Sequence, residues 1–250
     1  MQQQTEPKKQ VVRQGLNVKD LEDESRRIRK VYKQRERPTA CHGASPSNIY
    51  ERRAHLERNE LLVKILHKQG FHSLLGMRIL DVGCAGGSLL RHLLDLGARP
   101  GDCFGMDLLE ERLRVATHLS PNLGFVLGNG ALLPFPDDAF DIVFQSALFT
   151  SVLDPRIKRV ISSEILRTLR KGGRFVWYDF IYNNPRNANV RGIGRREIKE
   201  LLPNCRLRFW RVTLAPPIGR IAIRFSPLLY QVLSQLPLLR SHYLCIAEKL

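Results

Sequence analysis

Short apolar runs alternate with longer amphipathic segments through the middle of the chain. The runs that predict strands lie at residues 78–81, 103–107, 123–127, 140–145 and 174–179. The segments that repeat apolar residues every three or four positions, and so predict helices, lie at 88–96, 109–119 and 155–170. Strands that are joined by single helices form a parallel sheet with right-handed crossovers. The pattern therefore predicts an α/β fold with a doubly wound, mostly parallel sheet.

The helix predicted near 155–170 has a clear amphipathic pattern. One face gathers Ile157, Val160, Ile161, Ile165 and Leu169. Gly172 and Gly173 follow, and glycine commonly ends a helix. We therefore expect this helix to pack on the sheet and to stop at the glycine pair.

The pattern changes after residue 203. Residues 206–213 and 242–250 are strand-like, but no simple amphipathic helix of the earlier kind joins them. They could pair antiparallel at one edge of the sheet. The segment between them, 215–240, is an apolar insert with four prolines and three arginines. We expect it to be either a helical flap over the sheet edge or a surface for a hydrophobic substrate or a membrane.

Residues 1–46 are polar and charged, and they predict a partly disordered leader. Within it, residues 20–37 mix acidic and basic side chains at short spacing and can form a solvent-facing helix. Asn48 and Glu51 then have the spacing of a capping box, which predicts a helix up to about Gln69. We expect residues 47–250 to form a single domain with this N-terminal helical extension.

A glycine-rich turn follows the first predicted strand. Asp81 ends the strand, the small residues 83–87 follow, and Ser88 opens the next helix. Glycine permits positive φ angles and lets a ligand approach the backbone closely. The N-terminus of the next helix also favours polar ligand groups through its free N–H groups. This strand–turn–helix unit predicts a binding site for a small cofactor.

Two acidic residues and an amide narrow the choice of cofactor. Asp107 ends the second predicted strand, where a carboxylate accepts hydrogen bonds from ribose hydroxyls. The turn lacks the G-x-G-x-x-G form of a dinucleotide site, which disfavours the alternative of a nicotinamide oxidoreductase. Asp81 suits the ammonium group of a ligand with an amino-acid end. Asn129, in a turn before the apolar residues 132–135, suits an adenine ring.

The combined motifs resemble those of the Rossmann-like, class I S-adenosylmethionine-dependent methyltransferases. The resemblance spans roughly 60–180 and rests on ILDVGCAGG at 79–87, FGMD at 104–107, VLGNGALLPFPDDAFDIVFQS at 126–146 and EILRTLRKGGRFVWYDF at 164–180. The family implies a seven-stranded sheet with an antiparallel edge strand, and S-adenosyl-L-methionine as the cofactor. Its cofactor-binding positions correspond here to Asp81, Gly83, Cys84, Ala85, Gly87, Asp107, Leu108, Asn129, Gly130, Ala131 and Gln145.

Two of these positions depart from the residues that are usual in the family. Ala85 stands where many members have glycine, and its methyl group is tolerated if the local φ is negative. Asn129 stands where the residue that contacts adenine is often Asp, but its amide oxygen can still accept from the adenine amine. The resemblance also divides the domain into a cofactor-binding half, 60–150, and an acceptor-side half, 151–250.

The resemblance places the reacting methyl group at the ends of the fourth and fifth strands. Asp179 is the candidate catalytic residue, as a base or to orient the acceptor, and a purely structural carboxylate is the alternative. Ser146, Tyr178, Arg186 and Arg191 are the candidate acceptor-binding residues, and arginine suits phosphate or carboxylate. The Asn/Asp-Pro-Pro-Tyr type of run that marks amine acceptors is absent after the fourth strand. We therefore expect methyl transfer to a hydroxyl oxygen.

Charge is distributed unevenly along the chain, whose formal net charge is +16. Residues 59–150 hold seven Lys and Arg against ten Asp and Glu, whereas residues 151–250 hold nineteen against six. The basic region predicts an anionic or membrane-tethered acceptor, with peripheral membrane contact. An RNA methyltransferase would also suit this charge, but no RNA-binding module and no interleaved aromatic residues accompany it. A methyltransferase-like partner protein without activity is a further alternative.

Composition and the distal motifs bear on location and pathway. The five cysteines are scattered, which predicts reduced thiols and no metal site. The N-terminus does not resemble a signal peptide, and no run of about 18 apolar residues occurs. We therefore expect a cytoplasmic protein, either free or at the inner face of the membrane. Residues 145–155, 177–193, 211–217 and 236–244 together resemble a bacterial subgroup that is associated with polysaccharide biosynthesis and glycan assembly. We therefore expect a small-molecule, glycan or lipid-linked acceptor that is anionic or hydrophobic.

Overall fold

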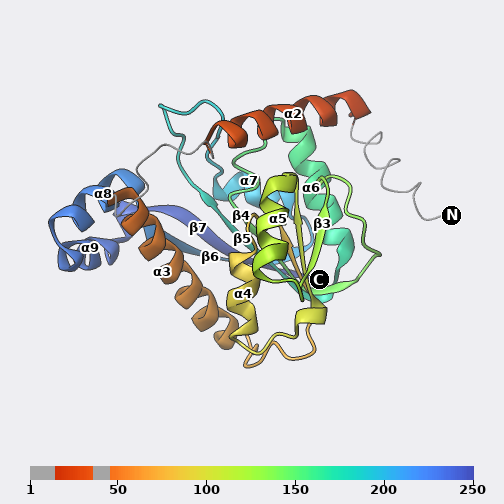
Figure 1. Ribbon diagram of the computed structural model, residues 1–250, viewed down its shortest axis with the longest axis horizontal. Coiled ribbons are helices and arrows are strands. Elements are labelled where there is room, and N and C mark those ends of the chain that lie inside the picture. The colour runs from red at the N-terminus through yellow and green to blue at the C-terminus, as the bar shows by residue number, and fades with distance from the viewer. Residues whose placement is uncertain (1–14, 36–45) are drawn as a thin grey trace.

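The computed structural model describes residues 15–35 and 46–250, and its centre is a seven-stranded sheet (Figure 1). The strand order is β3-β2-β1-β4-β5-β7-β6. The strands are β1 (Ile79–Val82), β2 (Cys103–Asp107), β3 (Gly124–Leu127), β4 (Phe140–Ser146), β5 (Leu169–Phe180), β6 (Cys205–Leu214) and β7 (Arg240–Lys249). This arrangement confirms the predicted fold class.

The register of the central strands determines where the site lies. Strand β1 is parallel to both β2 and β4, and Val82 faces Met106 on one side and Gln145 on the other. The carboxyl ends of the three strands therefore meet at one edge of the sheet. In an open α/β sheet, ligands bind outside these ends, where the direction of the crossovers reverses.

The last strand along the chain, β7, runs opposite to its neighbours. It pairs antiparallel with β5 on one side and with β6 on the other, as the strand-like texture after residue 203 predicted. The reversed strand thus lies one position in from the edge, and β6 forms the edge itself. Because β7 is reversed, its first residues lie beside the end of β5, and His242 pairs with Phe180.

Helices cover both faces of the sheet. They are α2 (Val18–Arg35), α3 (Pro46–Lys68), α4 (Ser88–Leu94), α5 (Glu110–Leu119), α6 (Pro155–Thr168), α7 (Arg195–Leu201), α8 (Pro216–Phe225) and α9 (Pro227–Ser234), with short 3₁₀ turns η1 (Pro100–Asp102) and η2 (Pro237–Leu239). Leu66 of α3 and Leu90 of α4 share one core cluster with Ile79 of β1. Val160 of α6 belongs to the second cluster, with Leu80 of the same strand. The alternation along β1 therefore separates two cores, one on each side of the sheet.

Two predicted helix boundaries are wrong. Helix α6 ends at Thr168, because the backbone at Leu169 is extended and already pairs with Phe140 of β4. Gly172 and Gly173 consequently lie inside β5 and not at the end of a helix. Helix α3 begins at Pro46, so the predicted capping residue Asn48 lies within its first turn.

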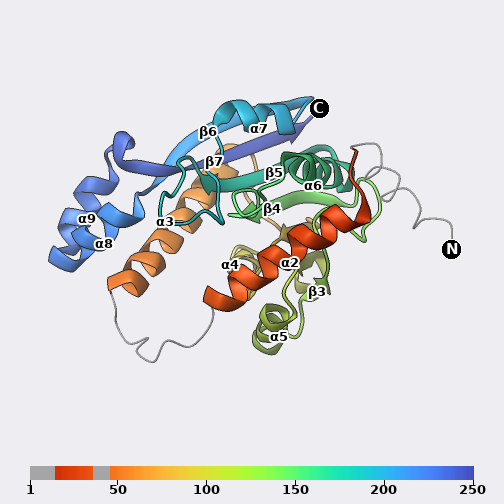
Figure 2. The ribbon, with the colours of Figure 1, turned by 90° about the horizontal axis from the view of Figure 1, so that it is seen from above.

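The prediction of a solvent-facing helix over residues 20–37 also needs correction. In both views α2 runs across the end of the sheet that carries the loops (Figures 1 and 2). Leu16 and Leu21 are buried in the core cluster of α6, and Ile28 packs against the same cluster. One face of α2 therefore belongs to the fold. The predicted disorder of the remaining leader concerns residues 1–14 and 36–45, outside the described residues.

The apolar insert forms α8, α9 and η2, which project at one end of the molecule (Figure 1). A small cluster of Tyr50, Leu214, Ala222 and Tyr230 attaches it to α3 and β6. Tyr50 donates from its hydroxyl to the Leu214 carbonyl at 2.6 Å. Among the described helices, none is long and apolar enough to span a bilayer.

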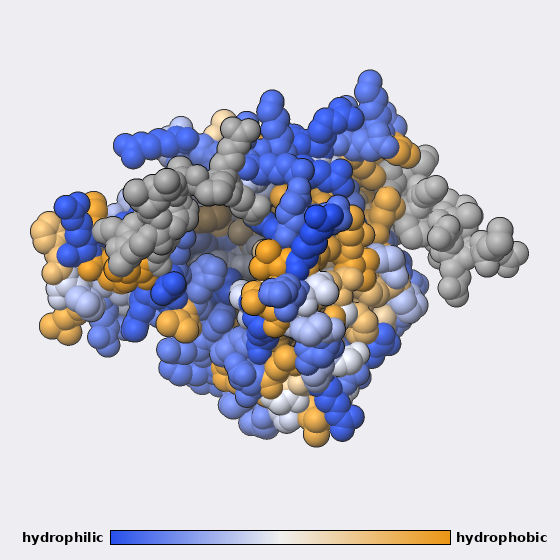
Figure 3. All heavy atoms as spheres, in the orientation of Figure 1, coloured by the Kyte–Doolittle hydropathy of each residue, from blue (hydrophilic) through white to orange (hydrophobic). Residues whose placement is uncertain are grey.

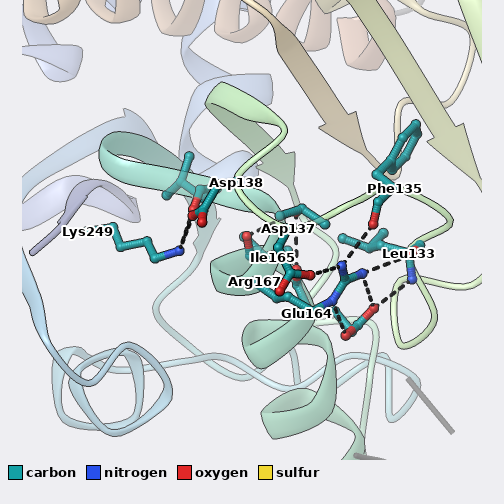
Figure 4. A network of polar contacts seen from close by, with 10 residues as sticks. Leu133, Phe135, Asp137, Asp138, Glu164, Ile165, Arg167 and Lys249 are labelled. Carbon is teal, nitrogen blue, oxygen red and sulfur yellow. Dashed lines mark hydrogen bonds and ion pairs between the residues drawn. The ribbon is translucent and has the colours of Figure 1, made fainter. Parts of the chain in front are cut away.

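A network of ion pairs and hydrogen bonds around Arg167 holds the loop between β3 and β4 (Figure 4). Arg167 of α6 donates to the carbonyls of Leu133 and Phe135 at 3.0 and 2.8 Å, and it pairs with Asp137 at 2.7 Å. The fully buried Glu164 accepts from the Leu133 N–H at 3.0 Å. Because this loop follows Asn129 directly, the network fixes one wall of the site described next.

The described cysteines are all unpaired, at positions 84, 103, 205 and 245, and Cys41 lies outside the described residues. Burial raises the pKa of the Cys103 thiol to about 11 and that of Cys245 to about 12. Both thiols therefore pack as small apolar side chains and are poor nucleophiles.

Candidate functional site

A cleft with about 740 Å³ of empty space, its open mouth included, lies at the carboxyl ends of β1, β2 and β4. Its floor comes from Val82, Gly83, Met106, Asp107, Leu108, Leu109, Arg112, Gly128, Asn129, Gly130, Ser146, Ala147, Leu148, Ser151, Val152, Ile157 and Ile161. Helix α2 covers it with Leu21, Glu24, Ser25, Ile28 and Tyr32. A cleft of this size, mostly apolar with a few polar groups, is typical of a small-molecule site.

The glycine turn leaves room for a ligand because side chains are missing where the backbone is left-handed. Gly83 and Gly87 have φ of 82° and 72°. A Cβ atom on Gly87 would lie 3.0 Å from the Phe125 ring, and one on Gly83 would lie 3.2 Å from the Leu148 side chain. Both glycines are therefore required by conformation and by space.

Ala85 does not meet the condition, a negative φ, under which its methyl group was expected to be tolerated. Its φ is +48°, in the left-handed region that L-residues rarely adopt. Its N–H donates to Asp107 Oδ2 at 2.9 Å, which fixes this conformation. The turn thus contains a strained residue in contact with the predicted ribose carboxylate.

Asp81 is buried and its carboxylate lacks a full set of partners. The side chain is 3% exposed, and Oδ1 has no hydrogen bond within the described part of the chain. Burial raises the pKa of this carboxyl to about 7, against the lowering effect of Arg58, and Asp107 raises it slightly further. A buried carboxylate oxygen without a donor is costly, and an ammonium group would satisfy it.

Asp107 is oriented by the backbone of the two turns that flank it. Oδ2 accepts from the Ala85 N–H and Oδ1 accepts from the Leu109 N–H, both at 2.9 Å. Each carboxylate oxygen keeps a further lone pair for a ligand hydroxyl. Asp107 and Leu108 both line the cleft, where the sequence predicted them.

The residues after β3 are brought to the cleft only in part. Asn129 and Gly130 line it, whereas Ala131 is fully buried beneath them. Asn129 Oδ1 accepts from the Ala131 N–H, and Nδ2 donates to Ser25 Oγ of α2, both at 2.9 Å. Asn129 therefore also ties the covering helix to the floor, a function that the sequence did not suggest.

The structure places Asp179 and Gln145 behind the cleft, which contradicts a direct role for Asp179 as a base. Asp179 is fully buried and accepts from the Thr150 hydroxyl at 2.6 Å, the Thr150 N–H at 3.3 Å and Gln145 Nε2 at 2.9 Å. Gln145 Oε1 accepts from the Leu148 N–H at 3.1 Å. Although burial raises the Asp179 pKa to about 6, the carboxylate holds the 147–151 loop and does not contact the cleft.

Ser146 connects the cleft to a second group of side chains, which we name the arginine–aromatic cluster: Arg58, Ser146, Tyr178 and His242. Arg58 of α3 donates to Ser146 Oγ at 2.8 Å and lies 5.4 Å from the Tyr178 ring centre. The Tyr178 ring stacks on His242 with centroids 4.8 Å apart, and its hydroxyl is 2.8 Å from Thr213 Oγ1. The cluster places a cation and a flat apolar surface next to the cleft.

Arg186 and Arg191 lie on the exposed loop between β5 and α7, and neither side chain lines the cleft. The loop is held near the site because the Arg191 N–H donates to the Thr150 carbonyl at 2.9 Å. Their predicted contact with the acceptor stays a prediction. In contrast, Ser146 and Tyr178 both contact Arg58 and so belong to one cluster.

Sequence reasoning missed the residues of α2 that cover the cleft, and also Arg58 and His242. A signal was present for α2, because Leu21, Ser25, Ile28 and Tyr32 repeat at helical spacing and share one face. For Arg58 the signal was its spacing. Arg58 lies four and eight residues after the buried Ala54 and Tyr50, and so on the same face of α3. His242 gave no such signal, because only the reversal of β7 brings it to the site.

The cleft fits S-adenosylmethionine on three observations from its own geometry. Asp81 offers an unpaired carboxylate oxygen for the ammonium group. Asp107 offers oriented oxygens for the ribose hydroxyls, and the Gly83 turn leaves space that a Cβ atom would occupy. Within the described residues, no group of three His, Cys, Asp or Glu side chains is placed to hold a metal.

Comparisons with known proteins agree with this fit. Residues 80–177 match the family model of the methyltransferase domain. The chain is 30% identical over 131 residues to the phthiotriol/phenolphthiotriol dimycocerosates methyltransferase of Mycobacterium tuberculosis, which covers 51% of this chain and 47% of that one. It is 33% identical over 126 residues to the fatty-acid O-methyltransferase of Mycolicibacterium smegmatis, covering 49% and 44%. The chain thus spans about half the length of these curated relatives.

Solved structures show the same fold. A SAM-dependent methyltransferase from Methanosarcina mazei superposes with a TM-score of 0.55 at 18% identity, covering 74% of this chain and 97% of that one. The family match favours S-adenosylmethionine over the alternative of a nicotinamide cofactor. Residues 80–177 are therefore similar to a methyltransferase domain, the fold around them is that of the Rossmann-like SAM-dependent methyltransferases, and both comparisons support S-adenosylmethionine as the cofactor.

Proposed function

We propose that this protein transfers a methyl group from S-adenosylmethionine to an oxygen atom of a hydrophobic, anionic small molecule. The observation that carries the proposal is the buried Asp81 carboxylate, which has an unpaired oxygen and directly precedes Val82 and Gly83 of the cleft lining. Such an unpaired polar group is expensive unless a ligand satisfies it.

Four residues would hold the cofactor. Asp81 would pair with its ammonium group, Asp107 would accept from its ribose hydroxyls, and Asn129 and Leu108 would flank its adenine. When bound, S-adenosylmethionine supplies a methyl group that a positively charged sulfur already activates for displacement. The protein's remaining task is to align an oxygen nucleophile and to exclude water.

Helix α2 and the arginine–aromatic cluster would perform that task. Leu21, Ile28 and Tyr32 cover the cleft and reduce its contact with water. Ser146 lines the cleft and also contacts Arg58, so an acceptor beside Ser146 would meet the guanidinium and the Tyr178 ring together. This cluster suits an acceptor with an anionic group and an apolar body.

The acceptor oxygen is a hydroxyl or a carboxylate, and the geometry bears on the choice. A hydroxyl loses its proton as the new bond forms, and a base accelerates this by about 10²–10⁴. Among the described residues near Ser146, Asp179 is fully buried, and burial with Arg58 nearby lowers the pKa of His242 to about 3. A carboxylate is already ionised and needs no base, and Arg58 can pair with it. We therefore propose a carboxylate acceptor as the second candidate beside the predicted hydroxyl.

The names of the relatives support a lipid-like acceptor. One relative acts on phthiotriol dimycocerosates and the other on fatty acids, as their names state. The predicted glycan acceptor rests only on the distal motifs, and it stays a prediction. A methyl-transfer assay can compare fatty acids, long-chain alcohols and lipid-linked glycans as acceptors.

Cofactor binding tests the first part of the proposal. We expect calorimetry to show binding of S-adenosylmethionine by the intact chain. Asp107→Ala should weaken it by about tenfold or more, since charge-assisted hydrogen bonds are worth about 1.5–3 kcal/mol. Asp95→Ala, an exposed carboxylate after α4, is the matched control and should bind normally. An intact, folded chain without measurable binding would refute the proposal.

Methyl transfer tests the second part. The assay incubates the protein and labelled S-adenosylmethionine with a long-chain fatty acid, a long-chain alcohol or a lipid-linked glycan. We expect labelling of the fatty acid or the alcohol, and a loss of turnover at saturating cofactor in Arg58→Gln. Normal cofactor binding with no labelling of any oxygen acceptor would favour the inactive partner protein instead.

A further inference from the structure

A band of exposed apolar side chains covers the outer side of the α8–α9 insert. Its members, which we name the α8–α9 tip, are Ile221, Phe225, Leu228, Val232, Leu236 and Leu238. Phe225 and Leu238 are 77% and 84% exposed. In Figure 3 apolar residues gather at the end of the molecule where these helices lie. Soluble proteins rarely expose a contiguous group of large apolar side chains without a binding partner.

The fold presents the tip outward and holds it rigidly. The inner side of α8 packs Gly219 and Ala222 against Tyr50, and a Cβ atom on Gly219 would lie 2.2 Å from the Tyr50 ring. Ile221 and Phe225, on the opposite side of the same helix, face away from the protein. Tyr230 anchors α9 by donating to Glu57 of α3 at 2.9 Å. The exposure of the tip is therefore built into the packing.

Charge distinguishes the surfaces that could cover the tip. The chain has no acidic residue between Glu200 and Glu248, whereas Arg220 and Arg224 lie on α8 itself. Arg224 is exposed, and Arg220 pairs only loosely with Glu51, at 3.4 Å. A symmetric dimer through the tip would bring these arginines toward one another, which is unfavourable. An anionic lipid surface instead offers both an apolar interior and negative headgroups.

The tip is also continuous with the arginine–aromatic cluster. Strand β6 contacts Tyr178 through Thr213 and contacts Tyr50 through the next residue, Leu214. Helix α8 begins two residues later, at Pro216. A bilayer that contacts the tip would therefore also lie close to the arginine–aromatic cluster.

We propose that the α8–α9 tip docks this protein on anionic membranes, with Phe225 and Leu238 inserted among the lipid chains and Arg220 and Arg224 at the headgroups. Helices α8 and α9 have ten and eight residues, too few to cross a bilayer, so they lie on its surface. The docking stands on these surface features and does not require the proposed methyl transfer.

Vesicle flotation of the full chain tests this docking. The probes are vesicles of phosphatidylcholine alone and of phosphatidylcholine mixed with phosphatidylglycerol. We expect the chain to float with the anionic vesicles and to be released by high salt. Phe225→Ser with Leu238→Ser should reduce the bound fraction by about tenfold or more, because each side chain loses its burial in lipid. Arg220→Gln with Arg224→Gln should reduce it on anionic vesicles only.

The matched control is Leu75→Ser with Leu119→Ser, which removes two leucines that are 59% and 55% exposed elsewhere on the surface. This control should float like the unchanged chain. Calorimetry with S-adenosylmethionine on every variant separates a failure of docking from a failure of folding or of the proposed function. The proposal is overturned if the unchanged chain does not bind anionic vesicles, or if the tip and control variants bind alike. The proposal would also be overturned if the unchanged chain forms a dimer and does not bind vesicles, and if only the tip variant dissociates that dimer.

Discussion

At the scale of single residues, Asp81 combines a predicted binding role with a cost to stability. Its carboxyl has a pKa of about 7 in the fold, above its usual value, because burial disfavours the charge. A carboxyl whose pKa is raised on folding holds its proton more tightly in the folded chain. The free energy of unfolding therefore falls as the pH rises from about 4 to about 7, and the cost persists above that range.

This cost predicts that Asp81→Asn stabilises the free protein near neutral and alkaline pH. At about pH 8 we expect the free energy of unfolding to rise by on the order of 2 kcal/mol, because a neutral amide replaces a buried charge. At about pH 5 the gain should shrink, since Asp81 is then protonated. Urea unfolding at both pH values measures the difference. A variant that is less stable at both would show that Asp81 is structural and already satisfied.

The same pKa predicts how cofactor affinity depends on pH. Below about pH 7 Asp81 is protonated and cannot pair with the ammonium group, so affinity for S-adenosylmethionine should fall as the pH decreases. Above about pH 8 the α-amino group of the cofactor loses its own proton, so affinity should fall again. Arg58 and Asp107 are the charged groups that act on Asp81. Calorimetry across this range should give a maximum, and Asp81→Asn should remove the acid limb; an unchanged acid limb would exclude Asp81.

The strain at Ala85 predicts a stabilising substitution. A left-handed backbone costs an L-residue roughly 1–2 kcal/mol, whereas glycine adopts it freely at an entropic cost of about 0.5–1 kcal/mol. Ala85→Gly should therefore raise the free energy of unfolding by about 0.5–1 kcal/mol. Gly87→Ala is the opposite control and should destabilise, because its Cβ would lie 3.0 Å from Phe125. Thermal unfolding of both variants measures this, and a destabilised Ala85→Gly would argue against strain.

Sequence reasoning predicted the position of a carboxylate at the cleft where that position depends on strand register, and it failed where the position depends on burial. Asp107 follows directly from its place at the end of β2, because parallel register fixes where that end lies. Asp179 has the same place at the end of β5, yet it is fully buried under Thr150 and Gln145. Sequence gives the position of a carboxylate along a strand, but not whether a loop covers it.

At the scale of elements, α2 shows how a charged helix can be mistaken for a solvated one. Most of its residues are charged, and this hides the apolar spacing of Leu21, Ile28 and Tyr32. The structure holds it over the cleft by contacts along its length. Glu24 accepts from the Leu153 N–H at 2.7 Å, and Ser25 accepts from Asn129 at 2.9 Å. A cover tied to the cleft floor should respond to whatever occupies the cleft.

We therefore expect cofactor binding to slow hydrogen exchange in α2. The amides of Val18–Arg35 should exchange more slowly with S-adenosylmethionine present, because the ligand would fill the space between the helix and the floor. Helix α9 is the internal control, since it is remote from the cleft lining and should not change. Mass spectrometry measures the exchange of both helices with and without the cofactor. Equal protection of α2 with and without cofactor would show that the cover is rigid and that ligands enter elsewhere.

At the scale of the whole molecule, the uneven charge and the exposed apolar tip belong to the same half of the chain. Residues 60–150 have a slight excess of acidic residues, whereas residues 151–250 carry the basic excess and the tip. Charge counting predicted an anionic partner for this half. It could not indicate which apolar residues are exposed, because the packing of Gly219 against Tyr50 decides which side of α8 faces outward.

This division predicts that the membrane affects the acceptor and not the cofactor. If docking brings the protein to a lipid acceptor, turnover of an acceptor embedded in anionic vesicles should exceed that in neutral vesicles by about tenfold, as the bound fraction rises. A short-chain, water-soluble acceptor should be methylated equally in both. Phe225→Ser with Leu238→Ser should remove the difference and leave turnover of the soluble acceptor unchanged. Because the soluble acceptor reports on the chemistry alone, a loss there would indicate damage to the site, whereas equal rates in both kinds of vesicle would show that the tip does not deliver the substrate.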